Sequence, residues 1–310
     1  MRTVVYPKNI IKGSKIAVIS PAGAVSTEQL TKQVDSLLKL GYEPVLGKHA
    51  LGSFNFGYSY SGSEQQRIDD LNWALNDSSI DAIWATRGGY GCQHLLRHIN
   101  LTSFRKNPKW YIGYSDNTVI QSFLLKKGFA SIHGQTIKTS SFGVTPESYD
   151  GITDILQGKK PKYQFQSTEY NRKGKAEGLL VGGNLSLVYA LLGTPYSFDF
   201  KDRILFIEEI GEDFYALDRM LISLDLAGVF KKIKGLVVGG MTNMGKEADN
   251  KDYEASFDGF ANEIIHHRIA EYDFPIVFDF PNGHIYDNRP LIIGGNVVLE
   301  SGKDAKLSFK

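Results

Sequence analysis

The chain has 310 residues, and 42% of them are hydrophobic, so it can bury a sizeable core and has the length of two domains. Its 35 Lys and Arg residues nearly balance 34 Asp and Glu residues, and a formal net charge of +1 argues against nucleic acid or an anionic membrane surface as a partner. The single cysteine, Cys92, excludes an internal disulfide and a cysteine metal cluster. With no signal peptide and no apolar stretch of about 20 residues, the sequence predicts a soluble cytoplasmic protein that recognises a small substrate.

The N-terminal half alternates short apolar runs with helical periodicity, which is typical of a parallel sheet covered by helices. Strands are predicted at residues 15–19, 81–86 and 110–114. Helices are predicted from the capping boxes Ser26-x-x-Gln29 and Ser63-x-x-Gln66, around His94, Leu95 and His98, and over residues 119–127. The predicted fold class is α/β, with an N-terminal parallel-sheet sandwich and flanking helices.

A polar and basic stretch between Gly158 and Lys175 predicts a domain boundary. We place a linker at residues 161–175, between an N-terminal domain of residues 1–160 and a C-terminal domain of residues 176–310. The second domain is predicted to be mixed α/β and β-rich, with apolar runs at 179–181, 204–207, 236–238 and 275–278 and helices at 186–192, 215–226 and 257–267. Its last apolar runs, 290–293 and 297–299, flank Gly294-Gly295-Asn296 and predict an antiparallel hairpin.

The segment Gly113-Tyr114-Ser115-Asp116-Asn117 places a serine between a predicted strand and a predicted helix. Such a turn exposes the hydroxyl, and the helix N-terminus behind it favours developing negative charge, so Ser115 is a candidate nucleophile. The alternative is that Ser115 only caps the helix. Asn117 stands where the G-x-S-x-G motif has its second glycine, which weighs against an α/β-hydrolase.

Acyl transfer also needs N–H donors for an oxyanion, and the loop of residues 87–91 follows a strand that ends at the same edge of the sheet as Ser115. The backbone N–H groups of Gly89 and Asp116 are the candidate donors. The loop matches neither G-x-G-x-x-G nor the Walker pattern, so phosphate binding is disfavoured. The simpler alternative is a turn that needs glycine for positive φ.

A serine nucleophile needs a base, and His284 lies in a turn-rich loop between two predicted strands, where a side chain can face a cleft. His133, which follows the fifth strand of the first half, is the rival base. His94 and His98 share a helix face, but no carboxylate or thiolate at a recognisable spacing joins them, so no metal site is predicted.

The acid that orients a catalytic histidine is expected at the end of a buried strand. The run Ile204-Leu205-Phe206-Ile207 leads into Glu208 and Glu209, and a buried carboxylate is costly without a partner. Glu208 is our choice and Glu209 the alternate. The competing interpretation is that both acids lie in solvent beyond the strand end.

Together these segments resemble the LD-carboxypeptidase family of serine peptidases, which includes the muramoyl-tetrapeptide carboxypeptidases and the microcin C self-immunity peptidases. The matching stretches extend over nearly the whole chain in one order: residues 15–23, 87–91, 113–117, 182–185, 192–195, 205–209, 218–219 and 283–284. Carried over residue by residue, the resemblance implies a triad of Ser115, Glu208 and His284, with the nucleophile on one domain and its partners on the other.

The resemblance further implies a metal-free, cofactor-free enzyme, often a homodimer, that cleaves an amide bond from an L to a D centre next to a free C-terminal carboxylate. In peptidoglycan recycling such an enzyme releases the terminal D-alanine of the murein tetrapeptide. Arg87 and the amides around Gly88 are candidates to bind that carboxylate. Glu209 departs from the Asp that is commoner at its position in the family.

Two other functions stay open from the sequence. The first is a microcin-type peptidase that acts on a nucleotide-peptide amide, although Glu208-Glu209-Ile210-Gly211-Glu212 lacks the serine-rich sequence of that branch and favours the murein branch. The second is a non-catalytic module that binds peptidoglycan fragments or nucleotides in the same cleft.

Overall fold

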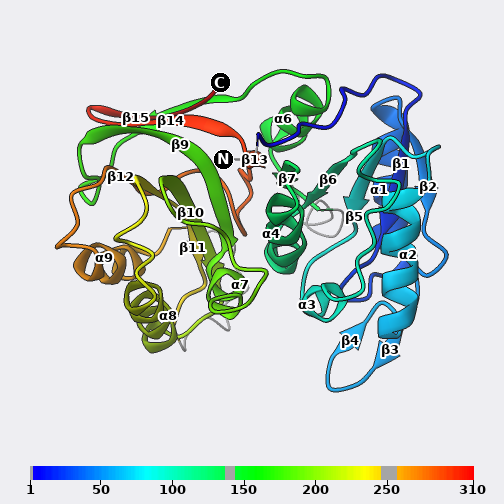
Figure 1. The fold of residues 1–310 in the computed structure, drawn as a ribbon, viewed down its shortest axis with the longest axis horizontal. Helices are drawn as coiled ribbons and strands as arrows, with labels where there is room; N and C mark the ends of the chain where they lie inside the picture. The colour runs from blue at the N-terminus through cyan, green and yellow to red at the C-terminus, as the bar shows by residue number, and fades with distance from the viewer. Residues whose placement is uncertain (1–2, 137–143, 246–256) are drawn as a thin grey trace.

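The computed structural model describes residues 3–136, 144–245 and 257–310. One half of the molecule, on the right of Figure 1, is built on a sheet of six strands. These are β1 (Lys15–Ile19), β2 (Glu43–Leu46), β5 (Ala82–Ala85), β6 (Trp110–Gly113), β7 (Ser131–His133) and β13 (Leu291–Ile293), in the spatial order β13-β7-β6-β5-β1-β2. All but β13 run parallel, and the fully buried residues of β5 and β6 are typical of strands covered on both faces.

Helices of this half are α1 (Thr27–Lys39), α2 (Glu64–Asn76), α3 (Cys92–Leu95), α4 (Thr118–Lys126) and α6 (Pro146–Leu156). Both predicted capping boxes are present, since Ser26 and Ser63 each exchange hydrogen bonds with the glutamine three residues on. The predicted helix around His94 is a single turn that ends before His98. A small hairpin, β3 (Phe54–Asn55) and β4 (Ser59–Tyr60), lies between β2 and α2 and has no strong sequence pattern.

The other half is built on a mixed sheet of seven strands. They are β8 (Lys162–Gln166), β9 (Gly174–Asn184), β10 (Arg203–Ile210), β11 (Gly235–Thr242), β12 (Ile276–Val277), β14 (Asn296–Ser301) and β15 (Asp304–Phe309), in the order β12-β11-β10-β9-β14-β15-β8. Helices α7 (Leu185–Ala190), α8 (Phe214–Leu226) and α9 (Gly259–Arg268) accompany it (Figure 1). The α/β class with a parallel-sheet half and a β-rich mixed half is confirmed.

Two predictions about the second half are wrong. Residues 161–175 are not a linker, because they contain β8 and the start of β9. Strand β8 lies at the edge of the sheet, and its alternating exposure is that of a strand with one covered face. The predicted hairpin of the last apolar runs does not form, because β13 pairs with β7 and β14 pairs with β9 and β15, in different sheets. Gly294 and Gly295 exchange hydrogen bonds with Leu180 where the chain crosses from one sheet to the other.

The larger of the two apolar clusters in the described residues spans both halves. A single cluster of buried residues includes Trp84 and Ile132 from the six-stranded sheet and Leu180 and Phe206 from the seven-stranded sheet. Helix α4 of the first half contacts β9 and α7 of the second. A continuous core of this kind disfavours independent motion of the halves, so residues from both can form one fixed site. No helix in the described ranges has the length and apolar character needed to cross a bilayer.

Candidate active site

Ser115 lies directly after β6, where it opens the short 3-10 helix η1 (Ser115–Asn117). Its φ is 63°, in the left-handed region that residues with a side chain rarely adopt. The N-cap position belongs to Tyr114, whose backbone is extended, so the interpretation of Ser115 as a helix cap is wrong. A serine in a strained strand-to-helix turn is instead the geometry of a nucleophile elbow.

Asn117 holds this turn in place. Its Nδ2 donates to the carbonyls of Tyr114 at 3.0 Å and Arg87 at 3.3 Å, and its Oδ1 accepts from the Tyr111 hydroxyl at 2.5 Å. A Cβ atom at Gly113 would lie 2.8 Å from the Asn117 side chain, so the glycine leaves the room that this asparagine occupies. The residue that departs from the hydrolase motif therefore ties the elbow to the loop after β5.

The glycine loop lies against the elbow. A Cβ atom at Gly88 would be 2.7 Å from the Cβ of Ser115 and 3.1 Å from the backbone nitrogen of Asp116, so only glycine fits there. Gly89 has a φ of 105°, which confirms that the loop also needs glycine for its backbone conformation. The Asp116 carboxylate accepts from the Cys92 N–H at 2.7 Å and so fixes the far end of the loop. Burial raises the pKa of Asp116 to about 6, although the Cys92 N–H opposes the rise.

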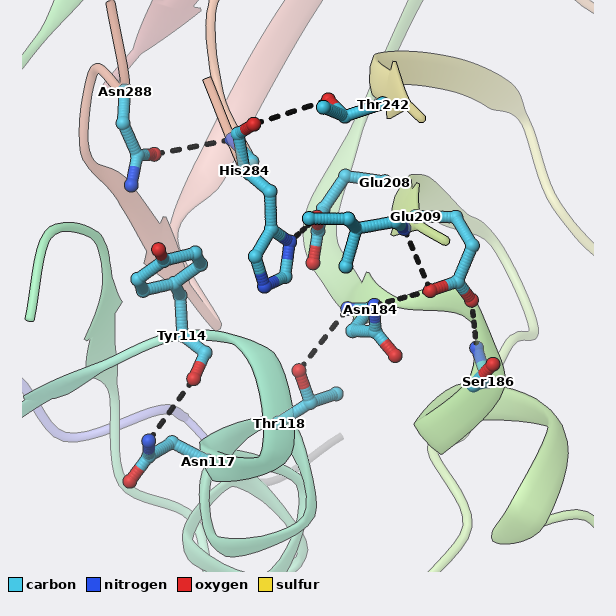
Figure 2. A network of polar contacts seen from close by, with 12 residues as sticks. Tyr114, Asn117, Thr118, Asn184, Ser186, Glu208, Glu209, Thr242, His284 and Asn288 are labelled. Atoms are coloured by element: carbon cyan, nitrogen blue, oxygen red, sulfur yellow. Dashed lines mark hydrogen bonds and ion pairs between the residues drawn. The ribbon is translucent and has the colours of Figure 1, made fainter. Parts of the chain in front are cut away.

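Glu208 and His284 are brought together across the second half of the chain (Figure 2). Glu208 is fully buried on β10, and its Oε2 lies 2.7 Å from Nδ1 of His284, whose side chain is 12% exposed. Burial would raise the pKa of Glu208, but the charge and hydrogen bond of His284 outweigh it and lower this pKa. Burial would lower the pKa of His284, but Glu208 raises it above its ordinary value. An ionised carboxylate that only accepts makes Nδ1 the donor and leaves Nε2 unprotonated.

The loop that carries His284 is shaped to approach Glu208. Gly283 has a φ of 121°, and a Cβ atom there would lie 2.9 Å from the Cβ of Glu208. The Gly283 N–H donates to Asn288 at 3.1 Å, and the Thr242 hydroxyl donates to the carbonyl of His284 at 3.1 Å. The backbone on both sides of the histidine is thus held by hydrogen bonds.

The imidazole of His284 also faces the elbow. Its ring lies against the ring of Tyr114, the residue before Ser115, with centroids 4.8 Å apart (Figure 2). The Ser115 hydroxyl makes no hydrogen bond to His284 within the described ranges. Catalytic hydrogen bonds are often long in enzymes without substrate and tighten when it binds.

Glu209 has a different environment from Glu208. Successive residues of a strand point to opposite faces, and the Glu209 carboxylate accepts from Asn184 Nδ2 at 2.8 Å, the Ser186 N–H at 2.7 Å and the Ile210 N–H at 2.9 Å (Figure 2). Burial and the charge of Glu208 raise the pKa of Glu209 to about 7 despite these donors. Both acids are buried, so the interpretation that they lie in solvent is wrong, and only Glu208 contacts a histidine.

His133, the rival base, is fully buried at the end of β7. Gln121 donates through Nε2 to two backbone carbonyls, so its Oε1 accepts from Nδ1 of His133 at 3.0 Å. Burial lowers the pKa of His133 to about 4, so the ring is neutral at physiological pH. Its Nε2 has no hydrogen-bond partner within the described residues. This histidine packs against Phe206 and has the environment of a core residue.

A polar contact joins the two halves beside the site. The Asn184 N–H donates to the Thr118 hydroxyl at 3.1 Å, and a Cβ atom at Gly183 would lie 2.5 Å from the same oxygen. Thr118 begins the helix that follows the elbow, while Asn184 ends β9 and binds Glu209. The contact therefore links the segment that carries Ser115 to the strand pair that carries the acids (Figure 2).

Arg87 follows β5 and is half-buried beside the glycine loop. Its Nη1 donates to the carbonyl of Ala24 at 2.9 Å, and its Nη2 lies 3.5 Å from the Tyr58 hydroxyl. Among the described residues, no group of three or more His, Cys, Asp or Glu side chains is arranged to hold a metal ion.

Residues 16–134 match the N-terminal domain of LD-carboxypeptidases, and residues 177–299 match the C-terminal domain. A probable murein peptide carboxypeptidase of Bacillus subtilis (strain 168) is 30% identical over 311 residues, which cover 96% of this chain and 92% of that protein. The chain belongs to the LD-carboxypeptidase family. It is therefore a serine-type carboxypeptidase.

Solved structures agree with this assignment. The muramoyltetrapeptide carboxypeptidase from Oxalobacter formigenes is 27% identical to this LD-carboxypeptidase and superposes with a TM-score of 0.82, over 96% of this chain and 98% of that one. A MccF-like protein from Bacillus anthracis str. Ames is 28% identical, with a TM-score of 0.81 over 98% of this chain and 99% of that one.

Sequence reasoning alone gave no role to several residues of this LD-carboxypeptidase site. Asn184 belongs to a stretch that resembles the family, but its contact with Glu209 depends on how β9 and β10 pair. Thr118 and Tyr58 stand in no recognisable motif. The strain at Ser115 had a local signal, because a serine between strand and helix after a glycine is typical of an elbow.

Proposed function

We propose that this protein is a serine LD-carboxypeptidase that removes the terminal D-alanine of the murein tetrapeptide during peptidoglycan recycling, with Ser115, Glu208 and His284 as its catalytic triad. The observation that carries the proposal is the 2.7 Å bond between Glu208 and Nδ1 of His284, next to Tyr114 and the strained Ser115. The names of the relatives support the substrate class.

In the proposed reaction, Nε2 of His284 takes the proton of the Ser115 hydroxyl as its oxygen attacks the carbonyl before D-alanine. The backbone N–H groups of Gly89 and Asp116 stabilise the resulting oxyanion. His284 then gives its proton to the leaving amine, and a water molecule deprotonated by His284 hydrolyses the acyl-enzyme. Glu208 stays ionised throughout and stabilises the imidazolium.

A carboxypeptidase also has to recognise the free carboxylate of its substrate. Arg87 and the amides around Gly88 are the proposed recognition elements, because they lie on the same loop as the oxyanion donor. Guanidinium groups and backbone N–H groups both favour carboxylates. The Arg87 guanidinium is held by Ala24, which keeps it at the rim of the loop.

The test is release of D-alanine from murein tetrapeptide by the purified protein and its Ser115→Ala variant. We expect turnover by the wild type and a loss of at least about 10³-fold in kcat for the variant, with an unchanged melting temperature. Near-normal turnover by Ser115→Ala would refute the nucleophile assignment. Peptides with lysine or diaminopimelate before D-alanine would define the preferred tetrapeptide.

A second candidate is a microcin-type peptidase that acts on a nucleotide-peptide amide, which the likeness to the MccF-like protein favours. It would use the same three residues on a different leaving group. Competition between murein tetrapeptide and an aminoacyl-sulfamoyl nucleotide distinguishes the two. The murein assignment predicts a kcat/KM for the tetrapeptide that exceeds that for the nucleotide conjugate.

The proposed setting of the enzyme follows from the family resemblance and the substrate. A recycling enzyme acts on fragments taken up into the cytoplasm, and we propose that location and a homodimer. Cell fractionation tests the first, and sedimentation or light scattering of the purified protein tests the second.

A further inference from the structure

The Tyr58 hydroxyl occupies a space that two glycines leave open. A Cβ atom at Gly23, after β1, would lie 2.8 Å from this hydroxyl, and a side chain at Gly89, after β5, would overlap it. Gly89 is the residue next to Gly88, which packs on Ser115. The Gly88–Gly89 peptide thus lies between the proposed nucleophile and the phenol.

Tyr58 is held in place by the base of its hairpin. The Ala24 N–H donates to the carbonyl of Ser59 at 3.0 Å, and the Ser61 N–H donates to the carbonyl of Ala22 at 3.0 Å. The ring of Tyr58 packs edge-on against the rings of Tyr60 and Tyr90, with centroids 5.2 and 6.0 Å apart. Hydrogen bonds and ring packing on both sides define the position of this half-buried side chain.

The hydroxyl has a proton available for a ligand. Arg87 is a donor only, so the Tyr58 oxygen accepts from Nη2 of Arg87, and no other partner of this oxygen lies within the described residues. The O–H of Tyr58 and the remaining N–H groups of Arg87 are therefore free to donate to one acceptor at the rim of the glycine loop. A carboxylate is the acceptor that suits a phenol and a guanidinium together.

The position suits the end of a peptide chain. In a substrate cleaved before its last residue, the free carboxylate lies one residue beyond the reacting carbonyl, or about 3.8 Å further along the chain. Gly88 and Gly89 are also one residue apart, and Gly88 packs against Ser115 while Gly89 packs against the Tyr58 hydroxyl. In a longer peptide, an amide followed by further residues would lie next to Tyr58 and Arg87 in place of the carboxylate.

We propose that Tyr58 is a specificity-determining residue that donates a hydrogen bond to the free C-terminal carboxylate of the substrate, together with Arg87. This inference rests on the proposed carboxypeptidase function. It adds a residue by which the enzyme selects substrates with a single residue beyond the cleaved bond. Tyr60 and Tyr90 support the ring and do not contact the carboxylate.

The experiment compares murein tetrapeptide with the same peptide carrying a C-terminal amide, for the wild type, Tyr58→Phe and Tyr90→Phe. Both substitutions remove one phenol hydroxyl from the same aromatic cluster, and Tyr90→Phe is the matched control. We expect Tyr58→Phe to lower kcat/KM for the acid about 10- to 100-fold, mainly through KM, and to change kcat/KM for the amide by less than about threefold. Tyr90→Phe should leave the acid-to-amide ratio unchanged.

Binding separates recognition from chemistry. In a Ser115→Ala background, Tyr58→Phe should weaken calorimetric affinity for the acid peptide by a similar factor and leave affinity for the amide nearly unchanged. An equal loss for both peptides, or no loss for the acid, overturns the role of Tyr58. If the folded wild type cleaves neither peptide, the proposed function fails, whereas an active wild type with an unaffected Tyr58→Phe variant refutes this inference alone.

Discussion

Two histidine rings lie against Tyr114, and their environments differ in ways that decide what each can do. His284, at 4.8 Å, sits in a loop, is paired with Glu208 and has a raised pKa. His133, at 6.0 Å, ends a buried strand, donates to a neutral glutamine and has a pKa lowered to about 4. A carboxylate partner stabilises the imidazolium that a general base must form, while a neutral partner in an apolar site disfavours it. The comparison favours His284 as the proposed base and leaves His133 as a residue of the core.

Substitutions of these two histidines should differ most in kcat. His284→Ala should lower kcat for D-alanine release by about 10⁴-fold, because Ser115 loses the group that takes its proton. His133→Asn keeps a donor near Gln121 and should stay within about tenfold of wild type in kcat, with a loss of about 1–3 kcal/mol in unfolding free energy from the smaller side chain. Steady-state kinetics and urea denaturation measure both. A larger kcat loss for His133→Asn would reverse the assignment.

The next contrast is between the two adjacent acids. Glu208→Gln should lower kcat by about 10³- to 10⁴-fold, because a neutral amide neither holds the imidazole nor stabilises its charge. Glu209→Gln places an amide group near the Ser186 N–H and should cost about 1–3 kcal/mol in unfolding free energy while kcat falls less than about tenfold. The control is the melting temperature of Glu208→Gln. Equal kcat losses in both variants would contradict separate roles for the acids.

Gly283→Ala should displace His284 and leave His133 in place. The new Cβ would meet the side chain of Glu208 at 2.9 Å, at a φ of 121° that alanine disfavours. We expect kcat to fall about 10- to 100-fold, because a misplacement of about 1 Å has an effect of this order. Gly193→Ala, at a positive φ with open space around it, is the matched control and should leave kcat unchanged. Similar kcat values in the two variants would argue against a positional role for Gly283.

The smallest effect is a shift in the pH dependence of kcat/KM. His284 must be unprotonated to act as base, and Glu208 raises its pKa, so activity should decline as the pH falls through that raised pKa. In Glu208→Gln the acidic limb of the residual activity should move to lower pH. Burial then lowers the pKa of His284, and the charge of Glu208 no longer opposes it. His133→Asn should not move the profile. An acidic limb that stays in place in Glu208→Gln would exclude His284 as its source.

Much of the fold was predictable because its signals are local. Both capping boxes lie within four residues of sequence, and the buried strands β5 and β6 are short apolar runs. The predictions of a linker at residues 161–175 and of a C-terminal hairpin were wrong because both depend on contacts that are not local. Strand β8 alternates polar residues with only two aromatics, Tyr163 and Phe165, which is a short signal within a polar and basic stretch. A turn-like Gly-Gly-Asn does not reveal that β13 and β14 pair with strands of different sheets.

Some features of the candidate site follow from local sequence, and others depend on contacts between distant segments. Neighbouring residues along the chain predict that a serine lies between strand and helix, that glycines lie at the same sheet edge, and that two acids end a buried strand. The folded structure was needed to show that Glu208 rather than Glu209 contacts His284, 76 residues away, and that Tyr58 contacts Arg87. The physical reason is that burial can be inferred from apolar pattern, whereas a hydrogen-bond partner depends on strand pairing and on how the two sheets pack.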